Sequence, residues 1–300
     1  MIKMDTGYKL AIVVSSVVVA AWILFPILWM FSLSLQTEPE IHSAPPTLWP
    51  KNPNIFNYWF IFDTSSAIEA RLQESGRLSF LPAVARWFPN ALVNSVIIGL
   101  VVTVINIIAA TLASYTFTRI RFKGSGLLFY MSVAGRLIPP VAIVVPYYII
   151  IQNFFGLNLL DTLFAVILVH AAFTLPINIW ILNTYLSAIP SDIEDAARVD
   201  GYGRLETLFK VVLPVILPGI VAIGIISFMV SWGEFFFAFM VTQTQQSRTL
   251  PVIVGFMAAQ PYKPVGILMA GGLVAMLPAL VMIAVFRRYL LKGLVAGAVR

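Results

Sequence analysis

Long stretches without a charged residue constrain the fold of this chain more than any other feature of its sequence. Residues 10–37 contain no Asp, Glu, Lys or Arg, and several later stretches are nearly as long and as apolar. A helix needs about 20 consecutive, mostly apolar residues to cross a bilayer. The whole chain is 60% hydrophobic, which is above the roughly 45–50% that is usual for soluble domains. The sequence therefore predicts an all-α integral membrane protein.

Six membrane-spanning helices are expected from these stretches. They cover residues 10–37, 87–118, 124–151, 162–186, 211–233 and 265–286. The first is too long to be the apolar part of a cleaved signal peptide, which has about 7–15 residues. The third contains Arg136, Pro139, Pro140 and Pro146. Proline removes a backbone donor and kinks a helix, so we expect this span to be broken and to line a cavity or a partner.

Lysine and arginine residues determine the predicted orientation. Six spans place both termini on the same side of the membrane. With the termini inside, cytoplasmic segments hold 12 Lys and Arg residues and external segments hold six, in agreement with the positive-inside rule. We therefore expect a multi-pass protein of the cytoplasmic (inner) membrane with both termini cytoplasmic. The twelve residues are Lys3, Lys9, Arg119, Arg121, Lys123, Arg198, Arg204, Lys210, Arg287, Arg288, Lys292 and Arg300.

The predicted organisation has two parts. Residues 1–86 hold the first transmembrane helix and an extended external loop, and residues 87–300 hold a core with the other five helices. The loop, residues 38–86, is rich in Pro, Asn and aromatic residues, and it forms either a large connection or a small external subdomain. Its segment 65–86 is expected to contain an amphipathic helix lying at the membrane interface.

Several functional classes are excluded by what the sequence lacks. The chain has no cysteine, which rules out a disulfide framework, a thiolate metal site and a cysteine nucleophile. Neither GxxxxGKS nor GxxxxGKT occurs, so there is no P-loop to hold nucleotide phosphates. We therefore expect no catalytic residue, no metal site and no cofactor on this chain. The net charge of +6 is explained by Lys and Arg beside the spans and requires no nucleic acid.

The segment 192–210 is unusually charged for such an apolar chain. It holds Asp192, Glu194, Asp195, Arg198, Asp200, Arg204, Glu206 and Lys210. These are about a quarter of all the charged residues, and they lie between the fourth and fifth predicted spans. Something outside the apolar bulk is expected to meet this segment.

A short helix is predicted at the start of the charged segment. Ser191 and Glu194 have the spacing of a capping box, and Gly201 can end the helix in a left-handed conformation. The resulting helix has about nine residues, which is too short to be stable alone in water, so it must dock on something. Its predicted docking face consists of Ile193, Ala196, Ala197 and Asp200. The alternative, a solvated linker between two spans, stays open on these physical grounds.

The stretch DAARVDGYGRLETLFKVVLP resembles the EAA-x3-G-x9-I-x-L-P signature of permease subunits of binding-protein-dependent ABC importers. The signature positions are occupied by Asp195, Ala196, Ala197, Gly201, Val211, Leu213 and Pro214, with Asp in place of Glu and Val in place of Ile. The resemblance implies a type I importer permease fold in which this loop is the coupling helix, inserted into a cleft of a separate ATPase. It assigns ATPase coupling to Glu194, Asp195, Ala196, Ala197, Asp200 and Gly201.

Further stretches resemble the carbohydrate branch of these permeases, especially the smaller permease of maltose importers. They are PNALVNSVIIG, FTRIRFKGSG, FMVSWGEFFFAF, SRTLPV and RRYLLKGLVAGAVR, and they extend the resemblance over residues 89–300. Two features depart from the family: Gly233 stands where Asn is usual, and the loop 38–86 is longer. The solute is not specified, so a sugar, an oligosaccharide, a polyol and a glycerol-phosphate compound all remain open.

The resemblance also implies partners. They are a second permease subunit, a dimer of ATPases that carries ATP and magnesium, an extracytoplasmic solute-binding protein, and membrane lipid. The C-terminal tail is expected to reach the ATPase through Arg287, Arg288, Lys292, Gly293 and Gly297. The external segment 242–264 is expected to enter the cleft of the binding protein through Gln246, Arg248, Thr249, Leu250 and Pro251. The simpler alternatives are a positively charged anchor and an ordinary connector.

Polar residues within the spans are candidates for the translocation pathway. They are Arg136, His170, Asn178, Trp232 and Glu234. An arginine at the centre of a membrane helix costs about 2.5–3.5 kcal/mol on insertion scales, so Arg136 should face a cavity or a partner, with Glu234 as a candidate counter-charge. His170 and Asn178 either line the pathway or make hydrogen bonds between helices. A secondary transporter or an intramembrane enzyme is a weaker reading, because no internal repeat and no catalytic constellation is found.

Overall fold

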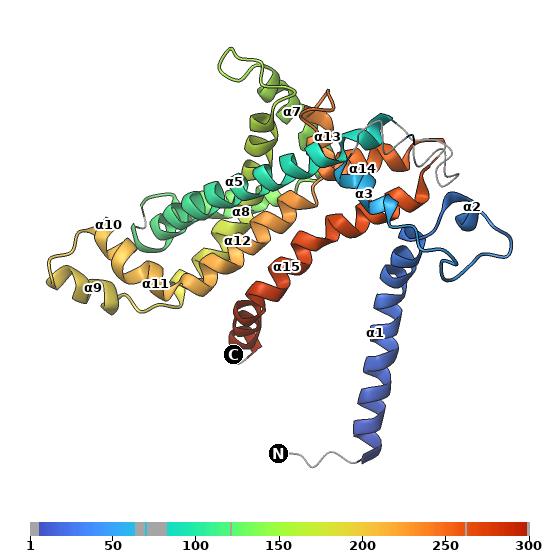
Figure 1. The fold of residues 1–300 in the computed structure, drawn as a ribbon. Helices are drawn as coiled ribbons and strands as arrows, with labels where there is room; N and C mark the ends of the chain where they lie inside the picture. The colour runs from blue at the N-terminus through green and yellow to red at the C-terminus, as the bar shows by residue number, and fades with distance from the viewer. Residues whose placement is uncertain (1–5, 64–69, 71–82, 121, 262, 299–300) are drawn as a thin grey trace. The chain divides into compact units, whose positions relative to one another are not determined.

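The computed structural model describes residues 6–63, 70, 83–120, 122–261 and 263–298 of the chain, and within these ranges it contains helices and no strand. Figure 1 shows the order of the helices along the chain. Four helices are long and apolar enough to cross a membrane, and the number rises to six when each of two bent helix pairs is taken as one span. The described helices thus agree with the six predicted spans.

The chain divides into two compact units. The first unit consists of residues 1–89 and 254–276, and the second consists of residues 90–253 and 277–300. Three helices contribute residues to both units: α5 (Phe88–Tyr115), α14 (Leu250–Ala258) and α15 (Val265–Ala298). This division differs from the sequence-based one at residue 86, because residues that are distant in sequence are joined in the first unit.

The first unit contains α1 (Thr6–Ser34), α2 (Glu38–Ile41), α3 (Phe56–Phe62) and the 3-10 helix η1 (Ala83–Trp87). Buried Asn57 joins its parts, since its Nδ2 donates to the carbonyl oxygens of Ser34 at 2.9 Å and Gln36 at 3.2 Å. The amide of Gly266, near the start of α15, donates to Glu38 Oε1 at 3.1 Å. Most of the interfacial helix predicted over residues 65–86 falls outside the described residues.

The second unit is built around α5, α8 (Leu163–Ser187) and α12 (Leu217–Trp232). One buried apolar cluster joins these helices near the charged segment. Its members are Ala110, Tyr115, Ile179, Leu182, Leu186, Leu208, Val212, Ile216 and Ile223. Gly219 allows α12 to approach α8 closely, because a Cβ atom at this position would lie 2.8 Å from the ring of Tyr185.

Two of the predicted spans, the third and the fifth, are broken. The prolines of the third span predicted its break. The third span consists of α6 (Ser125–Ala134), a 3-10 turn η3 (Gly135–Leu137) and α7 (Pro140–Gln152), with a bend of 107°. The fifth span is preceded by α10 (Arg204–Thr207), the π-helical turn η4 (Leu208–Val212) and α11 (Leu213–Val215). This preceding segment is bent by 81° from α12. Prolines account for both bends, because they cannot donate a helical hydrogen bond.

Two segments differ from their predicted character. The segment 242–264 was predicted to be an external segment or an ordinary connector, with no helix assigned to it, but it contains helix α14 (Leu250–Ala258), in which Val252 and Ile253 are buried. It follows another short helix, α13 (Phe236–Val241). The C-terminal tail continues α15 as helix to Ala298, beyond the predicted end of the sixth span at residue 286.

Candidate functional site

The charged segment begins with the predicted short helix, α9 (Asp192–Val199). Its C-terminal end is confirmed as a left-handed cap, because Gly201 has a φ of +90°. The amide of Tyr202 donates to the carbonyl of Ala197 at 3.0 Å, and the amide of Gly201 donates to that of Arg198 at 3.0 Å. These two bonds form a Schellman motif, which satisfies carbonyls that the helix itself leaves unpaired.

The predicted capping box at the N-terminal end of α9 is wrong. Ser191 has helical dihedral angles, φ −63° and ψ −26°, and its side chain accepts no capping hydrogen bond. Glu194 does not reach back to Ser191 because its carboxylate binds residues of another helix instead. A buried partner outside α9 has therefore replaced the local one.

Glu194 is held by Arg119 and Tyr115, at the end of α5. Arg119 Nε donates to Glu194 Oε1 at 2.5 Å, and the Tyr115 hydroxyl donates to Oε2 at 3.0 Å. The Glu194 side chain is only 2% exposed and that of Arg119 is 13% exposed. A carboxylate loses most of its hydration at such a depth, so it requires a paired cation and further donors. Arg119 and Tyr115 supply both.

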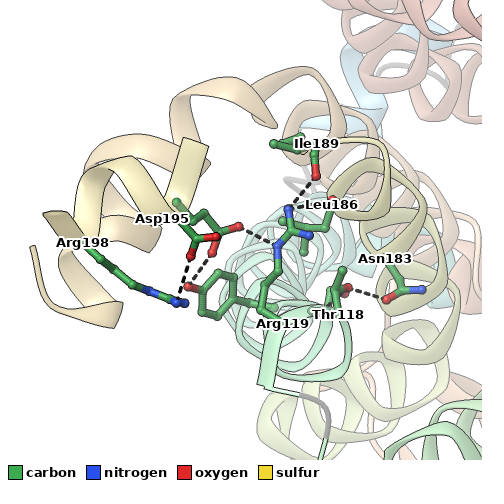
Figure 2. Close-up of polar contacts among 10 residues, drawn as sticks. Thr118, Arg119, Asn183, Leu186, Ile189, Asp195 and Arg198 are labelled. Atoms are coloured by element: carbon green, nitrogen blue, oxygen red, sulfur yellow. Dashed lines mark hydrogen bonds and ion pairs between the residues drawn. The ribbon is translucent and has the colours of Figure 1, made fainter. Parts of the chain in front are cut away.

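The same guanidinium group also binds the chain at the end of α8. Arg119 Nη2 donates to the carbonyl oxygens of Leu186 at 3.2 Å and Ile189 at 2.9 Å. Figure 2 shows Arg119 between these two carbonyls and α9. A cation is favourable there because the C-terminal end of a helix carries unpaired carbonyls and a partial negative charge. One side chain thus joins α9 to the ends of two long helices.

Arg119 lies in the π-helical turn η2 (Thr116–Ile120), which continues α5. This turn is itself bound to α8. The Thr118 hydroxyl donates to Asn183 Oδ1 at 2.6 Å (Figure 2). The Ser114 hydroxyl donates to the Ile179 carbonyl at 2.9 Å. The helical turn that carries Arg119 is therefore fixed to α8 as well as to α5.

The face of α9 that is exposed differs from the predicted docking face. Ala197 is 5% exposed and, like Glu194, faces the interior of the unit, so the prediction is wrong for Ala197. Ile193 is 42% exposed and Val199 is 88% exposed. Ala196, Asp200 and Gly201 are exposed too, and an ion pair of 3.1 Å between Asp195 and Arg198 lies at the surface. The available surface is an apolar strip, Ile193, Ala196 and Val199, beside exposed charges.

Sequence reasoning missed the two residues that hold α9. Arg119 was counted only as a positive charge at a membrane boundary, and Tyr115 was not singled out. Glu194 was grouped with the residues that meet the ATPase. No local pattern connects Arg119 with Glu194, because 75 positions separate them. The predicted tail residues Arg287, Arg288, Lys292, Gly293 and Gly297 lie in α15, and their side chains are outside the described part of the structure.

A second ordered site lies at the other end of α8, around Asp161. The amides of Gln243 and Thr244 each donate to Asp161 Oδ1 at 2.8 Å, and the Ser247 hydroxyl donates to the same oxygen. Partial burial opposes ionisation of the Asp161 carboxyl, but the hydrogen bonds from Ser247, Thr244 and Gln243 outweigh it and lower its pKa to about 2. No pattern in the sequence indicated a role for Asp161.

The predicted binding-protein segment is attached to the start of α5. The carbonyl of Gln246 accepts hydrogen bonds from Asn90 at 2.9 Å and Asn94 at 2.7 Å, and Leu250 N donates to Ser95 at 2.8 Å. Of the five predicted residues, Thr249 and Leu250 are buried and Arg248 and Pro251 are half-buried; only Gln246 is exposed. The prediction is therefore corrected: the accessible part is the loop containing Gln243, Thr244 and Gln246.

The proposed counter-charge for Arg136 is also corrected. Glu234 Oε2 lies 2.9 Å from His170 Nε2, and Glu234 accepts hydrogen bonds from the amides of Phe237 and Ala238 at the start of α13. Arg136 instead stacks on the Phe173 ring, with 3.6 Å from its Cζ to the ring centroid, and donates to the Phe173 carbonyl at 3.2 Å. It is half-buried at the bend between α6 and α7.

Three further pathway candidates are buried between helices of the second unit. His170 Nδ1 lies 2.9 Å from the Ser231 hydroxyl, and Asn178 Nδ2 donates to the Ser227 hydroxyl at 2.7 Å. Trp232 stacks on Phe228 with 5.7 Å between ring centroids. Their exposure is 6% or less, so they do not line an open path in this conformation. His170 and Asn178 join α8 to α12, whereas the stacking of Trp232 is within α12. No three His, Asp or Glu side chains of the described residues are placed to hold a metal ion.

A family model described as the binding-protein-dependent transport system inner membrane component matches residues 103–295. The chain belongs to this family. The matched region of this permease contains α8, α9, Arg119 and both broken spans. The sequence-based prediction of an ABC importer permease is confirmed, as is its multi-pass membrane character.

Individual relatives cover nearly the whole permease. It is 28% identical over 293 residues to the trehalose/maltose transport system permease protein MalG of Thermococcus litoralis, with 97% of each chain covered. It is 31% identical over 284 residues to the trehalose transport system permease protein SugB of Mycobacterium tuberculosis, with 94% of each covered. It is 30% identical to the sulfoquinovosyl glycerol transport system permease protein SmoH of Agrobacterium fabrum, covering 92% of the permease and 89% of the relative.

The fold of the permease is similar to that of a solved structure. A chain in the crystal structure of a bacterial ABC transporter involved in the import of the acidic polysaccharide alginate matches with a TM-score of 0.75, over 96% of the permease and 99% of that chain. The sequence identity is 17%, so this likeness concerns the fold alone. It confirms the all-α type I importer permease fold.

Proposed function

We propose that the permease forms half of a translocation pathway whose opening is driven by a separate ATPase docked on α9. The observation that carries this proposal is the construction of α9. Its inner side is fixed by Glu194, while Ile193, Ala196 and Val199 form an exposed apolar strip. Eight residues cannot maintain a helix alone in water. A helix that is anchored on one side and apolar on the other suits the groove of a partner protein.

The ATPase, with its ATP and magnesium, is proposed to be a separate subunit because this sequence has no P-loop. A second permease subunit would complete the pathway. With the termini inside, the predicted cytoplasmic segments together hold 12 Lys and Arg residues and the external ones hold six. This difference supports a cytoplasmic position for α9 and for both termini. The docking site therefore lies on the side where ATP is available.

The proposed solute is a sugar or a glycosylated compound delivered by an extracytoplasmic binding protein. Support comes from relatives whose names specify trehalose, maltose and sulfoquinovosyl glycerol. A polyol or a glycerol-phosphate compound is the alternative. The loop containing Gln243, Thr244 and Gln246 is the proposed contact with the binding protein, because it is accessible and held in place by Asp161.

The docking proposal is tested by replacing Val199 with Asp in the complex purified with its ATPase and second permease. We expect loss of most of the ATPase from the purified complex, because a charge would enter the apolar strip. The matched control is Phe155→Asp, which changes an apolar residue that is 92% exposed in the loop between α7 and α8. Full recovery of ATPase with Val199→Asp would overturn the docking site.

The solute proposal is tested separately, in the wild-type complex reconstituted in lipid. ATP hydrolysis is measured with the binding protein and a panel of sugars, polyols and glycerol phosphate. Stimulation by a sugar-loaded binding protein supports the proposal. Stimulation only by a polyol or glycerol phosphate would replace it with the alternative.

A further inference from the structure

We propose that the buried ion pair between Arg119 and Glu194 is the mechanical link by which movement of α9 is transmitted to the membrane helices α5 and α8. This inference rests on the proposed function, because it assumes that an ATPase moves α9. Both residues act as positioning residues: neither is proposed to touch the solute or the nucleotide.

Apart from the Glu194 carboxylate, α9 has few attachments to the rest of the unit. The helix is attached covalently through the short segments around Ile189 and Gly201, which contain turns and no rigid element. Of its side chains, only Glu194 and Ala197 are buried. A methyl group buries little surface, so Ala197 allows α9 to approach the unit closely but contributes little to holding it there. The Glu194 carboxylate is therefore the principal side-chain attachment of α9 to the rest of the unit.

The attachment through Glu194 is strong because it is a buried ion pair. Removing one partner of a buried ion pair leaves the other charge without water and without a counter-ion, which is strongly unfavourable. The pair between Asp195 and Arg198 is different, because its side chains are 62% and 45% exposed. Exposed pairs contribute little. Rotation of α9 away from α5 would break the buried pair, so α9 and the end of α5 are expected to move together.

The guanidinium group of Arg119 contacts α9 and the end of α8 at the same time. It is planar and rigid, and its donors are used on two sides: towards the α9 carboxylate and towards the carbonyls of Leu186 and Ile189 that follow the α8 core (Figure 2). Lysine could not make this set of contacts, because an ammonium group is a single compact donor centre. Movement of α9 therefore acts on α5 and α8 at one point.

The test uses the complex with its ATPase, second permease and binding protein, reconstituted in lipid. The variants are Glu194→Gln and Arg119→Lys, which remove the ion pair or its geometry with little change in size. The control is Lys210→Gln, which removes an exposed ion pair with Glu206 on the same side of the membrane. Three quantities are measured: the ATPase recovered per permease, the melting temperature of the complex, and the solute transported per ATP hydrolysed.

The expected result is a fall of about tenfold in solute transported per ATP for both variants, within the usual range of coupling between two sites. ATPase recovery should stay close to that of the wild type, because the exposed strip is unchanged, and Lys210→Gln should leave all three quantities unchanged. Combining the two substitutions should lower the ratio no further than either alone, since both break the same link. A purely structural role would change the melting temperature and leave the ratio unaltered.

An unchanged ratio in assembled Glu194→Gln and Arg119→Lys complexes would overturn the inference. If both variants fail to assemble, Tyr115→Phe decides, because it removes only one hydroxyl from the Glu194 carboxylate: a lowered ratio supports the link and an unchanged ratio overturns it. Failure of the proposed function would appear differently, as a wild-type complex without recoverable ATPase.

Discussion

Arg119 Nε lies 2.5 Å from Glu194 Oε1, although the two residues are 75 positions apart and belong to different predicted features of the sequence. The pair is buried, and it connects the charged segment 192–210 with the ends of two membrane helices. Its position explains why a helix of eight residues can be ordered in this chain. Local capping contributes at one end only, and tertiary contacts provide the rest.

The stability of the fold should depend far more on the buried pair than on the exposed one. Replacing Glu194 with Ala should lower the free energy of unfolding by about 3–5 kcal/mol, because the Arg119 charge would remain buried without its partner. Replacing Arg198 with Ala should cost less than about 1 kcal/mol, since its pair with Asp195 is exposed. Thermal unfolding of both variants in the same detergent checks this, and equal losses would contradict it.

The left-handed cap at Gly201 should be sensitive to any side chain. Gly201→Ala should destabilise α9 by about 1–2 kcal/mol, because a residue with a Cβ atom is unfavourable at positive φ. No heavy atom lies within 4 Å of the position that the new Cβ would take, so the effect arises from the backbone alone. The control is Gly203→Ala, where φ is −70°. Hydrogen exchange of the α9 amides should increase in the first variant only.

The close packing of α12 on α8 should not tolerate a larger residue at Gly219. Its added Cβ would lie 2.8 Å from the Tyr185 ring, and overpacking of this kind costs about 1–3 kcal/mol. Gly126→Ala is the control, because it is helical and its added Cβ meets nothing within 4 Å. The melting temperature of the purified permease should fall for Gly219→Ala and stay constant or rise for Gly126→Ala. A fall of the same size in both would contradict the packing argument.

The loop held by Asp161 should open in acid. The folded-state pKa of this carboxyl is about 2, below its usual 3.8. Its contribution to loop stability is therefore complete above about pH 4 and is lost as the pH falls through about 2. Hydrogen exchange of Gln243 and Thr244, compared with Asp161→Asn at each pH, should show extra protection in the wild type that disappears across this interval. Asp192→Asn, on exposed α9, should behave as the wild type does.

Features set by local pattern were predictable. The positions of the six apolar stretches follow from the length of helix that a bilayer requires. The break in the third span follows from Pro139 and Pro140, and the end of α9 follows from Gly201, since each depends on the backbone properties of one or two residues. The family resemblance of DAARVDG could also be recognised from the sequence, because its residues are contiguous, and the family match confirmed it.

The partners of the polar side chains could not be predicted in this way. Glu194 was predicted to bind Ser191 but binds distant Arg119, and Glu234 was predicted to pair with Arg136 but lies against His170. In each case the tertiary structure decided, because burial makes a well-oriented cation or donor worth more than a local hydrogen bond. The sequence by itself determined which segments cross the membrane and where the short helix ends. Only the packing of α5, α8 and α12 determined which face of α9 is exposed and which charges are paired.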